Sequence, residues 1–282
     1  MNDVGNIQWF PGHMTKTRRL IEADLKMVDA VVEITDARIP ESSRNPILDE
    51  LVKDKPRIIL MNKCDYADEA ATRTWKQFYE KKGIRVLTCD CRSGKGLNAF
   101  LPEVKRLLAD LIERRKKRGM IGKALRLMVV GIPNVGKSSF INRMAKTKKT
   151  KVGDKPGVTR GKQWVSIDKD VELLDMPGIL WPKFDDQVAA QRLAFTGAIK
   201  DDVMDIEALA RALGAVLKEQ YPELLNARYK LSGDEDILRD IAKSRGMLVS
   251  GGEPDTERAA AALLDEYRGG KIGRITLEKP GK

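Results

Sequence analysis

A run of residues in the middle of the chain has the types and spacing of a loop that binds nucleotide phosphates. It reads Gly131-Ile132-Pro133-Asn134-Val135-Gly136-Lys137-Ser138, follows the apolar residues 125–130 and leads into a helical pattern over residues 139–145. Glycines in such a loop let backbone N–H groups approach phosphate oxygens at a helix N-terminus. Lys137 would reach the β and γ phosphates, and Ser138 would ligate Mg²⁺. We expect nucleotide contacts from Asn134, Val135, Gly136, Lys137, Ser138 and Ser139.

Two further segments supply groups that such a loop needs. Asp175-Met176-Pro177-Gly178 follows the apolar residues 171–174, where a nucleotide switch needs a carboxylate for Mg²⁺ and a glycine N–H for the γ phosphate. Thr159, in the Gly- and Lys-rich residues 153–161, is the candidate switch threonine that closes on Mg²⁺ and the γ phosphate. Alone, the first segment is equally typical of a turn after a strand, and Thr159 of an ordinary loop. The functional interpretation therefore depends on the phosphate loop.

A third motif, Asn62-Lys63-Cys64-Asp65, comes directly after the apolar residues 58–61. The Asp65 carboxylate can accept hydrogen bonds from N1–H and the exocyclic amino group of guanine, while Asn62 supports the loop and approaches N7. Adenine would leave Asp65 facing an acceptor, and an unpaired buried polar group discriminates strongly between ligands. A surface turn is the alternative for this motif alone. Together with the phosphate loop it predicts GTP rather than ATP.

The pattern of apolar residues predicts the elements that position these motifs. Runs with β-branched residues at 30–34, 58–61, 84–88 and 125–130 alternate with helical spacing, which indicates βαβ units and a mainly parallel sheet. Residues 163–167 and 171–174 suit a hairpin added to that sheet. We therefore expect an α/β fold of the P-loop class. Its motifs would lie at the carboxyl edge of the sheet, where ligands bind.

The last third of the chain has a different pattern. Amphipathic helices are expected over residues 187–199, 206–219, 235–243 and 256–267. We place a domain boundary near residues 182–186, which gives a nucleotide-binding domain over residues 1–182, with a basic N-terminal helix, and a small helical domain over 183–282. The phosphate-sensing residues 175–178 run almost directly into that helical domain, so a shift driven by the γ phosphate could reposition it.

Charge and composition restrict the compartment and the partners. The net charge is +11, and the excess lies in the first two thirds of the chain. Basic clusters of this kind indicate a polyanion, with nucleic acid first, although a solvated helix end is the simpler alternative. No apolar run approaches a bilayer span, and three cysteines are too few for a disulfide framework, so we expect a cytoplasmic protein with ordinary thiols. The clusters are residues 114–118, then Lys146, Lys148, Lys149, Lys151 and Lys155, and Lys16, Arg18 and Arg19.

The order of the motifs carries a family resemblance. In ordinary regulatory GTPases the Asn-Lys-x-Asp motif comes last, whereas here it precedes the phosphate loop. The sequence resembles the circularly permuted GTPases of the YlqF family, through residues 9–14 (Trp-Phe-Pro-Gly-His-Met), 36–40 (Asp-Ala-Arg-Ile-Pro), 62–65, 131–138, 156–159 (Pro-Gly-Val-Thr) and 175–178. The resemblance implies GTP hydrolysis stimulated by the ribosomal particle and a late role in assembly of the large subunit. It further implies the precursor of that subunit and its rRNA as partners, and a monomer when free.

The same resemblance guides the assignment of catalytic groups. Many GTPases have a water-orienting glutamine directly after Asp-x-x-Gly, but this chain has Ile179, so another group must help. His13, the sole histidine, is the candidate, with an incidental histidine as the alternative; Lys137 and Thr159 complete the catalytic set. Asn134 resembles the asparagine of potassium-stimulated GTPases, which adds K⁺ to Mg²⁺ as an expected cofactor, unless it is only a turn residue. The Ser-Ala-Lys motif of typical GTPases is replaced by Asp90-Cys91-Arg92, so only a backbone contact near Cys91 is expected.

Three alternatives remain open at the level of sequence. A P-loop ATPase would require that Asp65 does not contact the base. A GTP-regulated RNA-binding module would use the basic surface and hydrolyse negligibly. Binding to a membrane surface is less favoured, because the basic helix ends lack interleaved bulky apolar residues.

Overall fold

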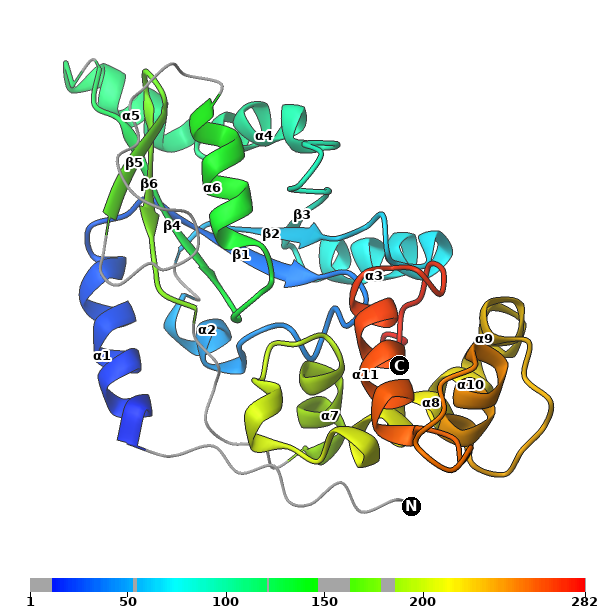
Figure 1. Cartoon of the computed structure of the whole chain (residues 1–282). Coiled ribbons are helices and arrows are strands. Elements are labelled where there is room, and N and C mark those ends of the chain that lie inside the picture. Colours follow the sequence, from blue (N-terminus) through cyan, green and yellow to red (C-terminus); the bar gives the residue numbers. More distant parts are fainter. Residues whose placement is uncertain (1–11, 53–54, 121, 147–162, 179–185, 282) are drawn as a thin grey trace.

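The computed structural model describes residues 12–52, 55–120, 122–146, 163–178 and 186–281, and these residues form a central sheet with helices on both faces (Figure 1). The strand order is β3-β2-β1-β4-β6-β5. All neighbouring strands are parallel except the β5–β6 hairpin. This arrangement confirms the predicted α/β fold with an added hairpin. The strands are β1 (Ala30–Asp36), β2 (Arg57–Asn62), β3 (Arg85–Thr88), β4 (Leu125–Gly131), β5 (Gln163–Asp168) and β6 (Val171–Asp175).

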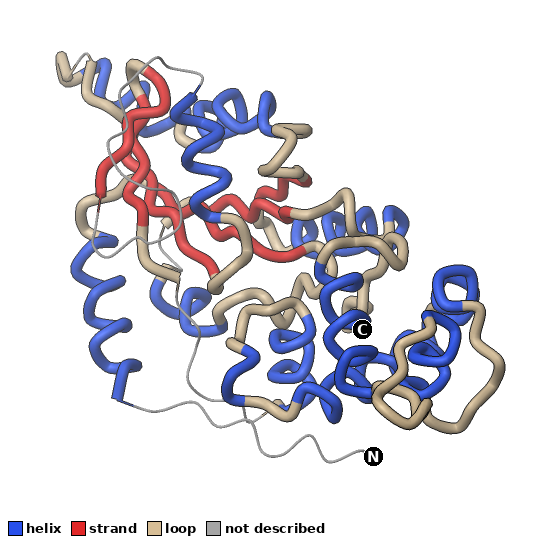
Figure 2. Tube along the Cα trace, in the orientation of Figure 1, coloured by secondary structure: helices blue, strands red, loops and turns tan. Residues whose placement is uncertain are grey.

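Both faces of the sheet are covered, and the central strands direct apolar side chains to both sides. In β1, Val32 packs into a cluster with α4 and α6, whereas its neighbour Val31 packs into a second cluster with α1 and α2. Such continuous apolar runs are typical of parallel strands between two helical layers, which Figure 2 shows. The helices of these layers are α1 (Gly12–Leu25), α2 (Pro46–Leu51), α3 (Glu69–Lys81), α4 (Phe100–Leu107, after the 3₁₀ turn Leu97–Ala99), α5 (Ala109–Lys117) and α6 (Lys137–Lys146).

The last third of the described chain is helical, as expected. Its helices are α7 (Gln187–Phe195), α8 (Ile206–Gln220), α9 (Pro222–Tyr229), α10 (Ile237–Arg245) and α11 (Thr256–Arg268), with a 3₁₀ turn at Asp201–Val203. The helix predicted over 187–199 ends at Phe195 instead, because Gly197 takes a φ of +74° and its N–H closes the turn onto Ala194 O. Helix α9 was not predicted; its Pro222 sits in the first turn, where proline is tolerated.

After α11 the chain returns to the sheet. Residues 271–280, which we name the strap, run along the loops that follow β1 and β2. The N–H of Ile275 donates to Tyr66 O at 2.9 Å, and that of Leu277 donates to Arg38 O at 2.8 Å. One buried apolar cluster extends from β1, β4 and α6 to α8, α11 and the strap. The proposed boundary at residues 182–186 falls mainly outside the described residues, and the two-domain division stays a proposal.

Two further expectations concern the cysteines and the membrane. Cys64, Cys89 and Cys91 are free thiols, as predicted. None of the described helices is both long enough and apolar enough to cross a membrane.

Candidate functional site

The predicted phosphate loop connects β4 to the first turn of α6. Within it, Asn134 and Gly136 have φ values of +56° and +107°. A Cβ on Gly136 would collide with the side-chain amide of Asn62, so only glycine fits where the two segments approach. The loop thus leads into a helix N-terminus, where backbone N–H groups favour an anion. Ser138 and Ser139 lie in this first turn of α6.

Lys137 lies inside the curve of this loop. Its Nζ donates to Gly131 O at 3.0 Å and to Ile132 O at 2.9 Å. Burial lowers the pKa of Lys137 to about 8, although the charge of Asp175 opposes that shift. A Cβ on Gly178 would lie 3.0 Å from Lys137 Nζ, so the Gly178 backbone lies directly against the loop. The structure therefore brings Lys137, Asp175 and Gly178 together from two neighbouring strands.

The donors predicted for Mg²⁺ fit that ion chemically. Asp175 is the last residue of β6 and is paired in register with Val129 of β4, so its buried carboxylate lies beside the loop that carries Ser138. A hydroxyl and a carboxylate are hard oxygen donors, which Mg²⁺ combines with phosphate oxygens and water. The described ranges contain no group of three or more His, Cys, Asp or Glu side chains that could hold a metal ion.

Two predicted catalytic groups are not placed. Thr159 lies outside the described residues. The backbone of His13 belongs to α1, but its side chain is likewise outside what the structure describes.

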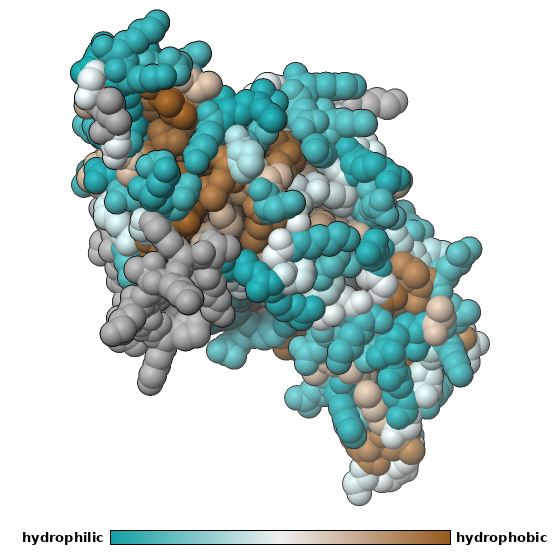
Figure 3. All heavy atoms as spheres, turned by 90° about the horizontal axis from the view of Figure 1, so that it is seen from above, coloured by the Kyte–Doolittle hydropathy of each residue, from teal (hydrophilic) through white to brown (hydrophobic). Residues whose placement is uncertain are grey.

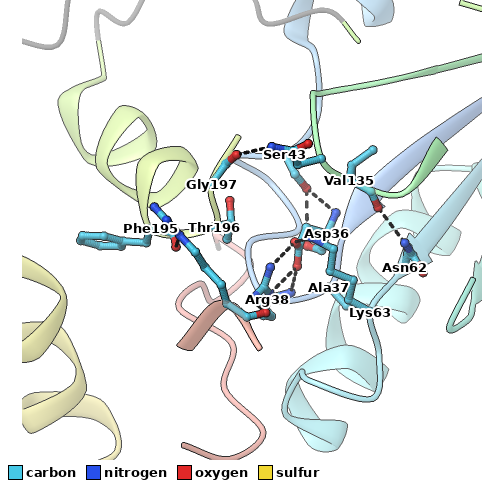
Figure 4. A network of polar contacts seen from close by, with 12 residues as sticks. Asp36, Ala37, Arg38, Ser43, Asn62, Lys63, Val135, Phe195, Thr196 and Gly197 are labelled. Atoms are coloured by element: carbon cyan, nitrogen blue, oxygen red, sulfur yellow. Dashed lines mark hydrogen bonds and ion pairs between the residues drawn. The ribbon is translucent and has the colours of Figure 1, made fainter. Parts of the chain in front are cut away.

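Asn62 joins three segments of the site. Its Nδ2 donates to the carbonyl oxygen of Val135 at 2.7 Å, and its Oδ1 accepts from the N–H of Cys91 at 2.9 Å. Sequence reasoning predicted loop support by Asn62 but missed this link to the phosphate loop. The Cys91 amide lies in the predicted region, yet its N–H is directed to Asn62 (Figure 4 shows the Asn62–Val135 bond).

Asp65 presents an unsatisfied acceptor. Its Oδ1 is buried and has no hydrogen-bond partner among the described residues. A buried carboxylate oxygen without a donor is costly, so this position favours a ligand that supplies N–H groups. Guanine does so with N1–H and its exocyclic amino group, whereas adenine presents an unprotonated N1.

Lys63, between these two residues, is held by a group that sequence reasoning gave no role. Its Nζ lies 3.0 Å from Oδ2 of Asp36, at the end of the adjacent strand β1. Arg38 holds the same carboxylate with two donors, Nε to Oδ1 at 2.9 Å and Nη2 to Oδ2 at 2.7 Å (Figure 4). The available signal was a pair of charged residues, Asp36 and Arg38, at the end of a buried strand.

Asn134 connects the phosphate loop to the helical region. Its Nδ2 donates to the carbonyl oxygen of Gly197, in the turn after α7, at 2.7 Å. Arg268 of α11 holds the same turn by donating to Phe195 O at 3.1 Å and to Ala194 O at 2.9 Å. The turn therefore touches both the loop and the last helix.

The predicted basic clusters differ in what the structure shows. Figure 3 shows hydrophilic side chains gathered where α5 ends, and Arg114, Lys116, Lys117 and Arg118 are exposed there. Arg115 instead pairs with Asp29 at 2.6 Å. Arg18 forms ion pairs with Glu22 and Glu50, at 3.0 and 2.8 Å, so its charge is less available to a polyanion. Residues 148–155 lie outside the described part.

Comparison with known proteins identifies relatives over nearly the whole chain. Residues 126–228 match the family model described as 50S ribosome-binding GTPase. The chain is 47% identical to ribosome biogenesis GTPase A of Bacillus licheniformis, with 97% of this chain and 98% of the relative covered. It is 34% identical to the Thermotoga maritima protein of the same name (97% and 95% covered) and 33% identical to the mouse mitochondrial ribosome-associated GTPase 1 (96% and 90%).

Solved structures agree with the sequence relatives. A GDP-bound structure of YlqF has a TM-score of 0.69 at 30% identity, with 93% of this chain and 99% of that chain covered. The crystal structure of GNP-bound YlqF from T. maritima has a TM-score of 0.65 at 30% identity, with 95% and 99% covered.

Proposed function

This chain belongs to the ribosome biogenesis GTPase A family, the circularly permuted GTPases known as YlqF, and on that premise we propose that it is a GTP-dependent switch in late assembly of the large ribosomal subunit. It hydrolyses GTP to GDP and phosphate as a member of that family. In the proposed cycle, the GTP form binds the pre-ribosomal particle and its rRNA, and hydrolysis releases the protein. It acts in the cytoplasm and is a monomer when free.

The observation that carries guanine specificity is the Oδ1 of Asp65, which has no hydrogen-bond partner within the described part of the chain. That oxygen is buried at the carboxyl edge of the sheet, and Asn62 ties its loop to the phosphate loop. A guanine whose N1–H and amino group face Asp65 would supply the missing donors, with its phosphates directed to the α6 N-terminus. A P-loop ATPase is therefore disfavoured, because adenine would leave this oxygen unpaired.

The chain's own groups then prepare the phosphates for hydrolysis. Lys137 would exchange the two loop carbonyls that it now contacts for β- and γ-phosphate oxygens, which carry more charge. Ser138, Thr159 and Asp175 would hold Mg²⁺, which when bound neutralises charge that develops on the phosphates. The N–H of Gly178 would report the γ phosphate, and the close approach of the Gly178 backbone to Pro133 and Lys137 supports this role.

Two further catalytic roles belong to this proposal. His13 would orient the attacking water in place of the missing glutamine. If a His13→Ala variant binds GTP normally and keeps full ribosome-stimulated turnover, His13 has no such role. Asn134 would support a K⁺ ion, since its Nδ2 is directed to Gly197 and its Oδ1 can accept a cation. Equal turnover in Na⁺ and K⁺ buffers would rule that out.

The decisive experiment is nucleotide-dependent cosedimentation with large-subunit precursor particles, together with measured GTP turnover. We expect cosedimentation with a non-hydrolysable GTP analogue, loss of it with GDP, and faster turnover when particles are present. Lys137→Ala is the control, because it removes the phosphate contact and should abolish the nucleotide dependence. Binding without any turnover, even with particles, would instead favour a GTP-regulated RNA-binding module.

A further inference from the structure

The guanine-recognition loop, residues 62–68, is attached to the helical region by a buried chain of charged groups. It begins at Lys63, whose φ is +60° and whose Nζ contacts the carboxylate of Asp36. Asp36 and Arg38 are each only 1% exposed. Burial alone would raise the pKa of Asp36, but Arg38 and Lys63 reverse that effect and hold the pKa far below its ordinary value. The carboxylate is therefore ionised and holds both cations.

Arg38 extends this chain to the end of α11. Its Nη1 donates to the carbonyl oxygens of Tyr267 and Arg268, both at 3.2 Å. Its guanidinium also lies over the rings of Tyr267 and Tyr66, 5.2 and 5.9 Å from their centroids. All three guanidinium nitrogens thus donate either to Asp36 or to the C-terminal turn of α11. The carbonyl groups at a helix C-terminus favour a cation.

The strap holds the opposite side of the same loop. The hydroxyl of Thr276 accepts from the N–H of Asp68 at 3.2 Å and donates to Ala37 O at 3.1 Å. The N–H of Ile275 donates to Tyr66 O. Gly270 makes this close approach possible: its φ is +69°, and a Cβ there would lie 2.8 Å from Cγ of Tyr66. The end of α11 and the strap therefore both pack against the guanine-recognition loop.

We propose that Asp36 and Arg38 are positioning residues for guanine-nucleotide binding, through which the docked end of α11 holds Lys63 and the guanine-recognition loop in their binding conformation. This inference rests on the proposed guanine site, and it adds a route from the helical region to the base. The route is separate from the phosphate side, where Asn134 contacts the turn after α7. A pre-ribosomal particle that binds the helical region would change nucleotide affinity through this route.

The physical basis is the small number of contacts that hold Lys63. A non-glycine residue with positive φ is strained and keeps that conformation only when its surroundings fix it. Burial lowers the pKa of Lys63, and the charge of Arg38 adds to that shift, whereas the charges of Asp36 and Asp65 oppose it. Of the two carboxylates, Asp36 is the one that forms an ion pair with Nζ, so it holds the side chain in place. Without the Asp36 carboxylate, Lys63 loses the ion pair that the structure gives it, and the loop loses this side-chain link to β1, although the backbone bond from Ala37 N–H to Asn62 O remains.

The first test is a double-mutant cycle that uses the release of N-methylanthraniloyl-GDP from the full-length protein. Asp36→Asn and Lys63→Met should each speed release by about tenfold or more, since each removes a charge-assisted contact. The double variant should be little worse than Asp36→Asn alone, because Lys63→Met removes a contact that Asp36→Asn has already weakened. Arg38→Met should speed release as well, although it touches neither the loop backbone nor the nucleotide.

The matched control for these variants is Arg44→Met. Arg44 forms a buried ion pair with Glu33, also of β1, but makes no contact with the guanine-recognition loop in the described residues. Thermal melts establish the fraction folded for every variant at the assay temperature. If loss of stability alone explains faster release, Arg44→Met will speed release as much as Asp36→Asn, and the inference is overturned. Additive effects in the double variant would also overturn it.

The second test acts from the helical side and leaves all loop residues unchanged. Gly270→Ala should push the α11 end away from Tyr66 and speed release about threefold or more, while ribose and phosphate contacts stay intact. Gly246→Ala is its control: it has nearly the same φ, +63°, but open space around the added Cβ. Equal release rates for these two variants would contradict the proposed route. Wild-type protein that fails to bind the labelled GDP would instead refute the guanine site itself.

Discussion

The side-chain nitrogen of Asn134 lies 2.7 Å from the carbonyl oxygen of Gly197 and donates a hydrogen bond to it. Asn134 belongs to the phosphate loop, and Gly197 belongs to the turn that ends α7. The same turn accepts two hydrogen bonds from Arg268 of α11. A movement of the phosphate loop can therefore act on the helical region through this hydrogen bond, in addition to the connection after Gly178.

Removal of this contact should weaken communication from the phosphates. We expect hydrogen exchange in residues 194–200 to differ between GDP and a GTP analogue in the wild-type protein. The Asn134→Ala variant should show faster exchange there in both states and a smaller difference between them, because the turn loses one of its anchors. Exchange that is the same in both nucleotide states across residues 186–281 of the wild type would argue against transmission to the helices.

Nucleotide affinity should fall as the pH rises through about 8. Burial lowers the pKa of Lys137 to about 8 in the free protein, so the ammonium is lost above that pH. The phosphates favour the charged lysine, so binding raises its pKa and takes up a proton at higher pH. Calorimetric titration with GDP from pH 6.5 to 9.5 should show this uptake. A Lys137→Met variant should lose the pH dependence in this range, and a dependence that persists would assign it to another group.

Base specificity should change with Asp65. In Asp65→Asn, the side chain offers a donor where guanine needs an acceptor, so affinity for GTP should fall by about 100-fold or more. Xanthine presents a carbonyl in place of the amino group, so affinity for XTP should rise. Displacement of the labelled GDP by GTP and by XTP measures both effects. If the variant keeps its preference for GTP, Asp65 does not contact the base.

Charge reversal at the end of α5 should weaken binding to rRNA. The exposed Lys116, Lys117 and Arg118 are changed together to glutamate, and affinity for a large-subunit rRNA fragment is measured at several salt concentrations. We expect affinity to fall by about tenfold or more and the salt dependence to become shallower, by about one unit of slope for each phosphate that the protein no longer neutralises. Lys218→Glu, Lys230→Glu and Arg258→Glu in the helical region form the control triple variant. A larger loss of rRNA affinity in the control variant would indicate that the RNA-binding surface lies on the helical region instead.

The sequence alone determined the features that depend on local pattern. Apolar runs bounded by polar residues predicted the parallel strands, because a strand between two helical layers is mostly apolar on both faces. The short gap between residues 163–167 and 171–174 predicted the antiparallel hairpin. Motif residues at strand ends predicted the phosphate loop and the base loop, because their chemistry depends on close neighbours in the chain. Residue periodicity does not reveal where a helix ends: α7 ends at Phe195 because of the conformation of Gly197.

Only the tertiary structure decided which distant groups meet. Asn62 reaches Val135, and Arg38 reaches the carbonyl oxygen of Tyr267, across 73 and 229 positions of sequence. No spacing rule specifies such pairs, because they arise when β1, β2 and β4 align at one edge and α11 returns to it. The sequence therefore predicted a site for guanine and phosphate, while the fold revealed that this site is tied to the helices from both of its ends.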